Sequence, residues 1–82
     1  MFQAVINVSL KDSILDPQGQ AAMQALEKMG LKGTRSVRVG KQFVLTLESA
    51  GKPAAEASVK KICDTLLVNP LIEKYAFTLN EI

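Results

Sequence analysis

Residues 36–47 read SVRVGKQFVLTL, and all their large apolar residues except Val44 fall on odd positions on both sides of Gly40. Because side chains alternate faces along a strand, this parity places the apolar set on one face. A two-residue Gly40-Lys41 turn would pair Val39 with Gln42 and mix the faces. The stretch therefore predicts either a hairpin with a three-residue loop and a glycine bulge, or one long strand bent at Gly40. The long strand would run beyond its own subunit and make the chain an obligate oligomer.

The sequence before this stretch predicts a strand followed by a helix. Residues 2–10 alternate apolar and polar side chains, the period of a half-buried strand. Asp16 can cap a helix expected over 17–29, with Pro17 at its first position and Gly30 ending it in a left-handed conformation.

Gly19 lies in the first turn of that helix. There it costs on the order of 1 kcal/mol relative to alanine. Such a cost is more easily explained if backbone or a partner approaches closely at this position.

The sequence after the central stretch, which covers about 34–48, predicts a second helix and a last strand. The second helix has Pro53 in its first turn and stops at Asn69-Pro70, and residues 75–79 alternate like a strand. Its apolar stripe comprises Ala55, Val59, Ile62 and Leu66, widened by Cys63 and Leu67.

This element order predicts a single α+β domain over residues 1–82. A β, α, long or doubled β, α, β order suits a two-layer sandwich with two helices on one face of an antiparallel sheet, as in ferredoxin-like split βαβ folds. Val5 and Val44 are apolar residues on otherwise polar strand faces. They indicate that a second subunit covers part of the open face.

Composition excludes several classes of protein. The chain of 82 residues carries ten basic and eight acidic side chains, a net charge of +2, which is too little to argue for a nucleic-acid surface. No apolar run approaches the roughly 20 residues of a membrane span, and the start lacks a leader pattern, so we expect no membrane insertion. The single cysteine, Cys63, excludes an internal disulfide and fits a reducing cytoplasm.

No residue pattern predicts catalysis or metal binding by this chain. It contains no histidine, and Cys63 lies on the apolar stripe of the second helix, as a core residue would. Gly40-Lys41 lies between strand segments, whereas a phosphate-binding loop needs several glycines leading into a helix. Arg38 and Lys41 fit two interpretations equally, solvated charges that protect a strand edge or a contact with a partner.

Three segments together resemble the PurS family, the small subunits of bacterial and archaeal phosphoribosylformylglycinamidine synthase. The segments are Leu15-Asp16-Pro17-Gln18-Gly19, Val37-Arg38-Val39-Gly40-Lys41 and Asn69-Pro70-Leu71-Ile72-Glu73. Their order and spacing agree with that family over essentially the whole chain. Residues 48–53 depart from it, since relatives often carry an acidic run into the second helix.

The resemblance implies a non-catalytic bridging subunit of an ATP-dependent carbon–nitrogen ligase of purine biosynthesis. In that complex the large subunit PurL uses ATP and Mg²⁺, the glutaminase PurQ releases ammonia from glutamine, and PurS joins them as a dimer with exchanged segments. No cofactor is expected on this chain. The residues carried over as partner or interface candidates are Asp16, Pro17, Gly19, Arg38, Gly40, Lys41, Asn69 and Pro70.

A second hypothesis remains open beside this one. A small dimeric regulatory domain of similar topology would bind an amino acid or nucleotide at its dimer interface. A ligand that raises the melting temperature would identify it.

Overall fold

The computed structural model describes all residues, 1–82, and has the predicted order of elements. These are β1 (Phe2–Leu10), α1 (Pro17–Lys28), β2 (Gly40–Leu47), α2 (Lys52–Ile62), a π-helical turn η1 (Cys63–Leu67) and β3 (Glu73–Glu81). Asp16 caps α1, and Gly30 follows it with a φ of 80°, both as predicted.

The three strands form one antiparallel sheet in the order β2-β1-β3. Ile6 at the centre of β1 lies opposite Phe43 on β2 and Phe77 on β3. The predicted alternation is therefore confirmed. One face of the sheet is apolar, and the α+β fold class holds.

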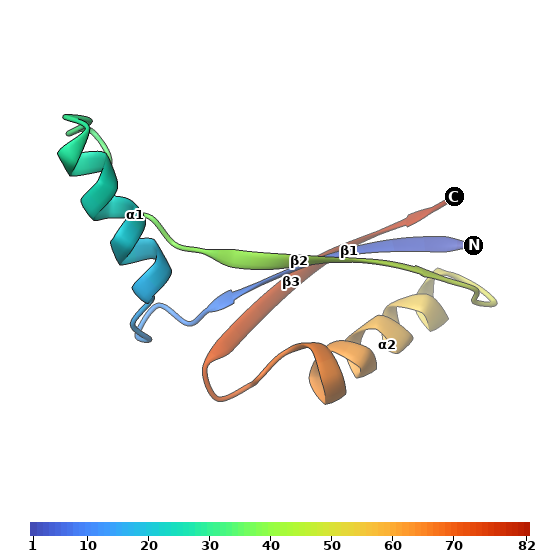
Figure 1. Ribbon diagram of the computed structural model, residues 1–82. Helices are drawn as coiled ribbons and strands as arrows, with labels where there is room; N and C mark the ends of the chain where they lie inside the picture. The colour runs from blue at the N-terminus through green and yellow to red at the C-terminus, as the bar shows by residue number, and fades with distance from the viewer.

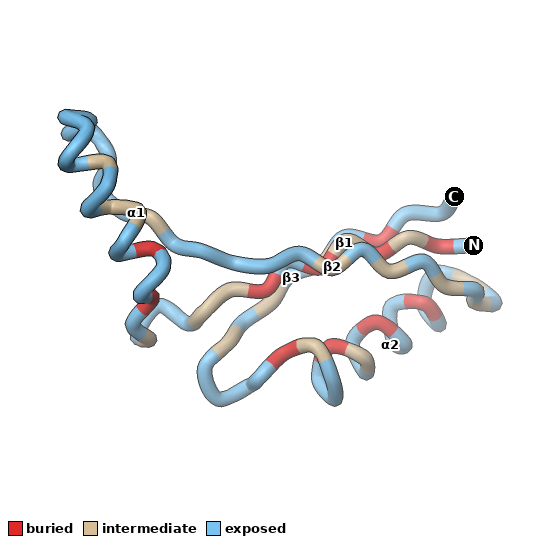
Figure 2. Tube along the Cα trace, viewed as in Figure 1, coloured by how far each residue is buried: buried red, intermediate tan, exposed pale blue.

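The helix α2 packs on this apolar face, mainly against β1 and β3 (Figure 1). Ala55, Val59 and Cys63 on its inner side have no exposed surface. They form one core with the buried residues of β1, which are Phe2, Ala4, Ile6 and Val8 (Figure 2). Cys63 is thus a core residue, as its place in the sequence predicted.

The end of the second helix differs from the predicted stripe. At η1 the hydrogen bonding changes to i→i+5, and the Val68 N–H donates to the Cys63 carbonyl at 3.0 Å. This extra residue in the turn rotates Leu66 outward, where 78% of it is exposed, and brings Val68 into the core at 8%. Placing Leu66 on the buried stripe was therefore wrong, because a constant helical period was assumed.

The central stretch does not form a hairpin. β2 begins at Gly40 and pairs with β1, while residues 34–39 have no strand partner and lead directly back to α1 (Figure 1). The hairpin alternative was therefore wrong for this chain. The structure matches the alternative in which the chain runs on beyond its own sheet, with only the part from Gly40 onward paired.

The first helix does not lie on the sheet beside α2. Residues 16–39, which we call the arm, project past the end of the sheet and give the chain an extent of 52 Å against 27 Å and 14 Å in the other directions (Figure 1). The expectation that both helices of one chain cover one face needs correction. The connections on both sides of α1 run away from the sheet, so α1 does not cover β2.

Neither helix is long and apolar enough to cross a membrane.

Candidate functional site

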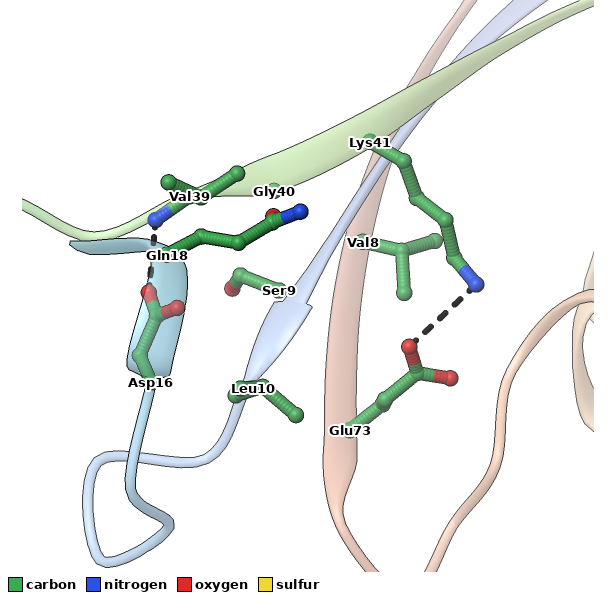
Figure 3. A pocket seen from close by; sticks show the side chains of 9 residues that line it. All are labelled: Val8, Ser9, Leu10, Asp16, Gln18, Val39, Gly40, Lys41 and Glu73. Carbon is green, nitrogen blue, oxygen red and sulfur yellow. Dashed lines mark hydrogen bonds and ion pairs between the residues drawn. The ribbon is translucent and has the colours of Figure 1, made fainter. Parts of the chain in front are cut away.

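Residues from all three sequence segments meet at one end of the sheet, where β1 ends and β2 and β3 begin. Asp16, Gly40, Lys41 and Glu73 are among nine residues that line a cavity of about 200 Å³ there (Figure 3). Residues far apart in the sequence thus form one site, which we call the bend site.

Asp16 connects the start of α1 to the start of β2. Its Oδ1 accepts a hydrogen bond from the Gly19 N–H at 3.1 Å, and its Oδ2 accepts one from the Val39 N–H at 2.7 Å (Figure 3 draws the second). The side chain is buried. The Val39 N–H, and then the Gly19 N–H, lower the pKa of this carboxyl below its usual value. Asp16 is therefore an ionised structural link.

Two glycines allow close backbone contacts around this link. A Cβ at Gly19 would lie 2.2 Å from the Val37 carbonyl oxygen, and one at Gly40 would lie 2.7 Å from the Val8 carbonyl oxygen. The expected close approach at Gly19 is confirmed, and it is made by the chain's own backbone. Both positions exclude larger side chains.

Arg38 binds the chain's own backbone. Its Nη2 donates to the Lys11 carbonyl and to the Ile14 carbonyl, each at 3.0 Å. Its guanidinium therefore holds the loop between β1 and α1. Neither sequence interpretation of Arg38, edge charge or partner contact, foresaw this contact.

Lys41 stays largely in solvent, with 53% of its side chain exposed. Its Nζ lies 3.3 Å from Glu73 Oε2 (Figure 3) and 5.8 Å from the centre of the Phe43 ring. Lys41 makes no hydrogen bond to the chain's own backbone, unlike Arg38, so its charge is the better placed of the two for contact with a partner.

Asn69 and Pro70 form the turn that leads into β3. The Asn69 N–H donates to Glu73 Oε1 at 2.7 Å, and Asn69 Oδ1 accepts from the Leu71 N–H at 3.1 Å. The Asn69 N–H, followed by Lys41, lowers the pKa of the Glu73 carboxyl. Glu73 was missed among the sequence candidates. The signal for it was its place at the end of the third family segment.

Pro17, the remaining candidate, lies exposed in the first turn of α1. The eight candidates thus divide by their contacts rather than by exposure, since Gly40 and Arg38 are exposed too. Asp16, Gly19, Gly40 and Arg38 organise the chain's own backbone, whereas the other four, Pro17, Lys41, Asn69 and Pro70, are all exposed.

The bend site has no arrangement for chemical catalysis. No group of three or more His, Cys, Asp or Glu residues is placed to hold a metal ion. The one thiol, Cys63, is fully buried under the sheet, and burial, with a smaller effect of Asp64, raises its pKa. The contacts of the bend site fix the directions in which α1 and residues 34–39 leave the sheet.

Comparison with known proteins identifies the family. A family model described as "PurS: Phosphoribosylformylglycinamidine (FGAM) synthase" matches residues 3–81. The chain belongs to the PurS family. The resemblance drawn from the three segments is confirmed.

Individual PurS proteins are similar along nearly their whole length. The PurS subunit of Bacillus subtilis is 39% identical over 82 residues, which cover 100% of this chain and 96% of that protein. The crystal structure of Methanocaldococcus jannaschii PurS matches with a TM-score of 0.90 at 27% identity, covering 100% and 99% of the two chains.

A further match is a chain in the structure of PurLQS from Thermotoga maritima. It has a TM-score of 0.89 and 32% identity, and the alignment covers 96% of each chain. The PurS fold of this chain is therefore shared with a member solved inside a multi-subunit assembly.

Proposed function

We propose that this chain is the bridging subunit of phosphoribosylformylglycinamidine synthase. That enzyme converts the amide of formylglycinamide ribonucleotide into an amidine, using ATP and the ammonia released from glutamine. The observation that carries the proposal is the match along 96% of the chain to a structure from PurLQS. The chain would align PurQ with PurL, so that ammonia passes between them without escaping or becoming protonated.

The chemistry then belongs to the partners of this chain. ATP and Mg²⁺ would be bound by PurL, and glutamine would be hydrolysed by PurQ. A buried thiol, no histidine and no metal cluster fit a subunit that contributes no reacting group. A single free cysteine also fits a complex located in the cytoplasm.

We further propose that the chain is a dimer in which arms are exchanged. Phe43, Leu45 and Leu47 on β2 are only half-buried, because α2 packs mainly against β1 and β3. The arm carries Met23 and Leu26, which are half-buried and line a pocket with residues 31–34 of the arm itself, on a helix that does not pack on the sheet of its own chain. An arm from a second copy would place residues 34–39 along the free edge of β2 and its α1 over these β2 side chains.

The exposed residues of the bend site are the proposed contacts with the large subunits. Lys41 is the strongest of them, because 53% of its side chain is exposed while its ion pair with Glu73 orients it. An exposed ion pair of this kind adds little to folding stability. Substitution at Lys41 should therefore affect binding more than folding.

Assembly from purified subunits tests the proposal. PurL and PurQ of the same source, mixed with and without this chain, are analysed by light scattering after size exclusion. We expect a three-component complex only with the chain present, and a weaker one with Lys41→Ala. A Lys52→Ala variant, at the far end of the sheet, is the matched control. Equal assembly with and without the chain would reject the bridging role, and equal binding of both variants would reject the contact at Lys41.

A further inference from the structure

We propose that Arg38 is a positioning residue that locks the hinge of the arm, and so selects arm exchange over a chain folded back on itself. The inference rests on the exchanged dimer proposed above. In this account, one side chain determines whether the sheet is covered by the arm of a second copy or by its own arm folded back.

The arm is joined to the sheet by two connections that lie side by side. The first is the loop of residues 11–15 after β1, and the second is Gly40, where the arm ends and β2 begins. Arg38, two residues before the second connection, donates to the Lys11 and Ile14 carbonyls of the first, both at 3.0 Å. One guanidinium thus links the two connections about which the arm could rotate.

The loop that Arg38 grips is itself fixed to the sheet. The Lys11 N–H donates to the Ile72 carbonyl at 2.8 Å, and the Ile14 N–H donates to the Lys11 carbonyl at 2.9 Å. Lys74 Nζ lies 2.9 Å from Asp12 Oδ1. The loop is therefore joined at Lys11 and Asp12 to the residues at the start of β3, and the bonds of Arg38 link the arm to it.

The start of the arm is also rigid, so that the hinge decides its direction. Asp16 Oδ2 holds the Val39 N–H at 2.7 Å, and Gly19 packs closely against the Val37 carbonyl. These contacts join α1 to residues 34–39, the other part of the arm. Reorientation of the arm must therefore occur at the two connections that Arg38 links.

Folding back would remove Arg38 from its acceptors. Gly40 lies opposite Ser9, so the chain before Gly40 continues alongside the loop that follows β1. In a folded-back chain, residues 34–39 would instead pair with the outer edge of β2, two strand spacings or about 10 Å from β1. The Lys11 and Ile14 carbonyls would then lose their shared donor. Both bonds come from Nη2, whose two N–H groups point in fixed directions in the guanidinium plane, whereas the ammonium group of lysine lies on a flexible stem.

The test compares Arg38→Gln with Arg35→Gln. Arg35 is the same residue type three positions earlier in the arm, and it is exposed with no hydrogen bond or ion pair. Light scattering over a dilution series gives the dimer dissociation constant. We expect Arg35→Gln to match the parent chain, and Arg38→Gln to raise the constant about 10-fold or more. Arg38→Lys, which keeps the charge, should also raise the dissociation constant. It serves as the test variant if Arg38→Gln does not fold.

A distance measurement separates a hinge from a simple dimer contact. Spin labels are placed at Lys32→Cys near the tip of the arm and at Glu56→Cys on α2, in a Cys63→Ala background diluted with unlabelled chain. With Arg38 replaced, the hinge account predicts a new population with a shorter distance within one chain, because the arm folds back.

Three results would count against the proposal. An unchanged dissociation constant for both Arg38 variants would overturn it, as would dissociation with the arm still extended. A parent chain that is monomeric at every concentration would overturn the exchanged dimer itself, which the first two results leave standing.

Discussion

The carboxylate of Asp16 joins two parts of the chain that no local pattern connects. It accepts hydrogen bonds from the N–H groups of Gly19 and Val39 and lies almost fully buried. The role of Asp16 as a helix cap follows from its place before Pro17 and was predicted. Its bond to Val39 was not, since periodicity contains no information about which distant backbone group meets a given side chain.

The lowered pKa of Asp16 predicts acid sensitivity. Because hydrogen bonds from Val39 and Gly19 lower its pKa in the folded state, its stabilising effect is present above the ordinary carboxyl pKa of about 4. That effect is lost as the pH falls through the folded value. We expect Asp16→Asn to lower the melting temperature at pH 7 by on the order of 5 °C and to flatten its decline between pH 5 and pH 3.

The matched control for this titration is Glu27→Gln, which removes an exposed carboxylate without a hydrogen-bond partner. It should leave the melting curve at pH 7 unchanged. Some acid dependence should remain in Asp16→Asn, since hydrogen bonding also lowers the pKa of Glu73. Parallel declines in the parent and Asp16→Asn would contradict the assigned role of Asp16.

Gly19 gives a second prediction for a single residue. Alanine there gains about 1 kcal/mol of helix propensity. Its Cβ, however, would lie 2.2 Å from the Val37 carbonyl oxygen, which is too close without backbone movement. We expect Gly19→Ala to lower the free energy of unfolding by roughly 1–3 kcal/mol in urea titrations. Gly33→Ala, with nothing within 4 Å of the added Cβ, should stay within about 0.5 kcal/mol of the parent.

At the scale of elements, the sequence predicted the regular strands and helices, but it did not predict the irregular π-helical turn. The strands and the start of both helices followed from alternation, capping residues and prolines, which are local properties. The π-helical turn η1 did not, because it depends on how the chain end of α2 fits the sheet. A single extra residue in that turn exchanged the environments of Leu66 and Val68.

Paired truncations test this assignment. Val59 has no exposed surface, so Val59→Ala should lower the free energy of unfolding by roughly 1.5–3 kcal/mol. Leu66 is 78% exposed, and Leu66→Ala should change it by less than about 0.5 kcal/mol. The simple helical stripe predicts a large loss at both positions. A loss at Leu66 comparable to that at Val59 would therefore contradict the π-helical turn.

At the scale of the whole molecule, the position of α1 could not be read from one chain. Amphipathic spacing predicts that a helix has an apolar face, but it does not predict whether that face packs on the sheet of its own chain or on the sheet of a second copy. The parity across Gly40 left two alternatives open, a hairpin with a glycine bulge and a chain that runs on past its own sheet, and the structure matches the second. The bend site shows the physical reason, since Asp16 and Arg38 hold both ends of the arm away from the sheet.

In the proposed complex, the chain as a whole contributes binding surfaces and no catalytic side chains. A hydrogen-bonded bend site, an exposed Lys41 and a half-buried apolar face on β2 fit a subunit that binds other subunits. A small regulatory domain would instead be stabilised by a free amino acid or nucleotide. If this chain is left out of the proposed complex, transfer of ammonia should be impaired more than the ATP-dependent step.

Amidine formation by purified PurL and PurQ, with and without this chain, tests the central claim most directly. Glutamine and then ammonium are supplied as the nitrogen donor. The bridging account predicts that glutamine-dependent turnover requires the chain, whereas ammonium-dependent turnover at PurL is largely independent of it. If the chain changes neither reaction, or changes both equally, its role in joining the two active sites is contradicted.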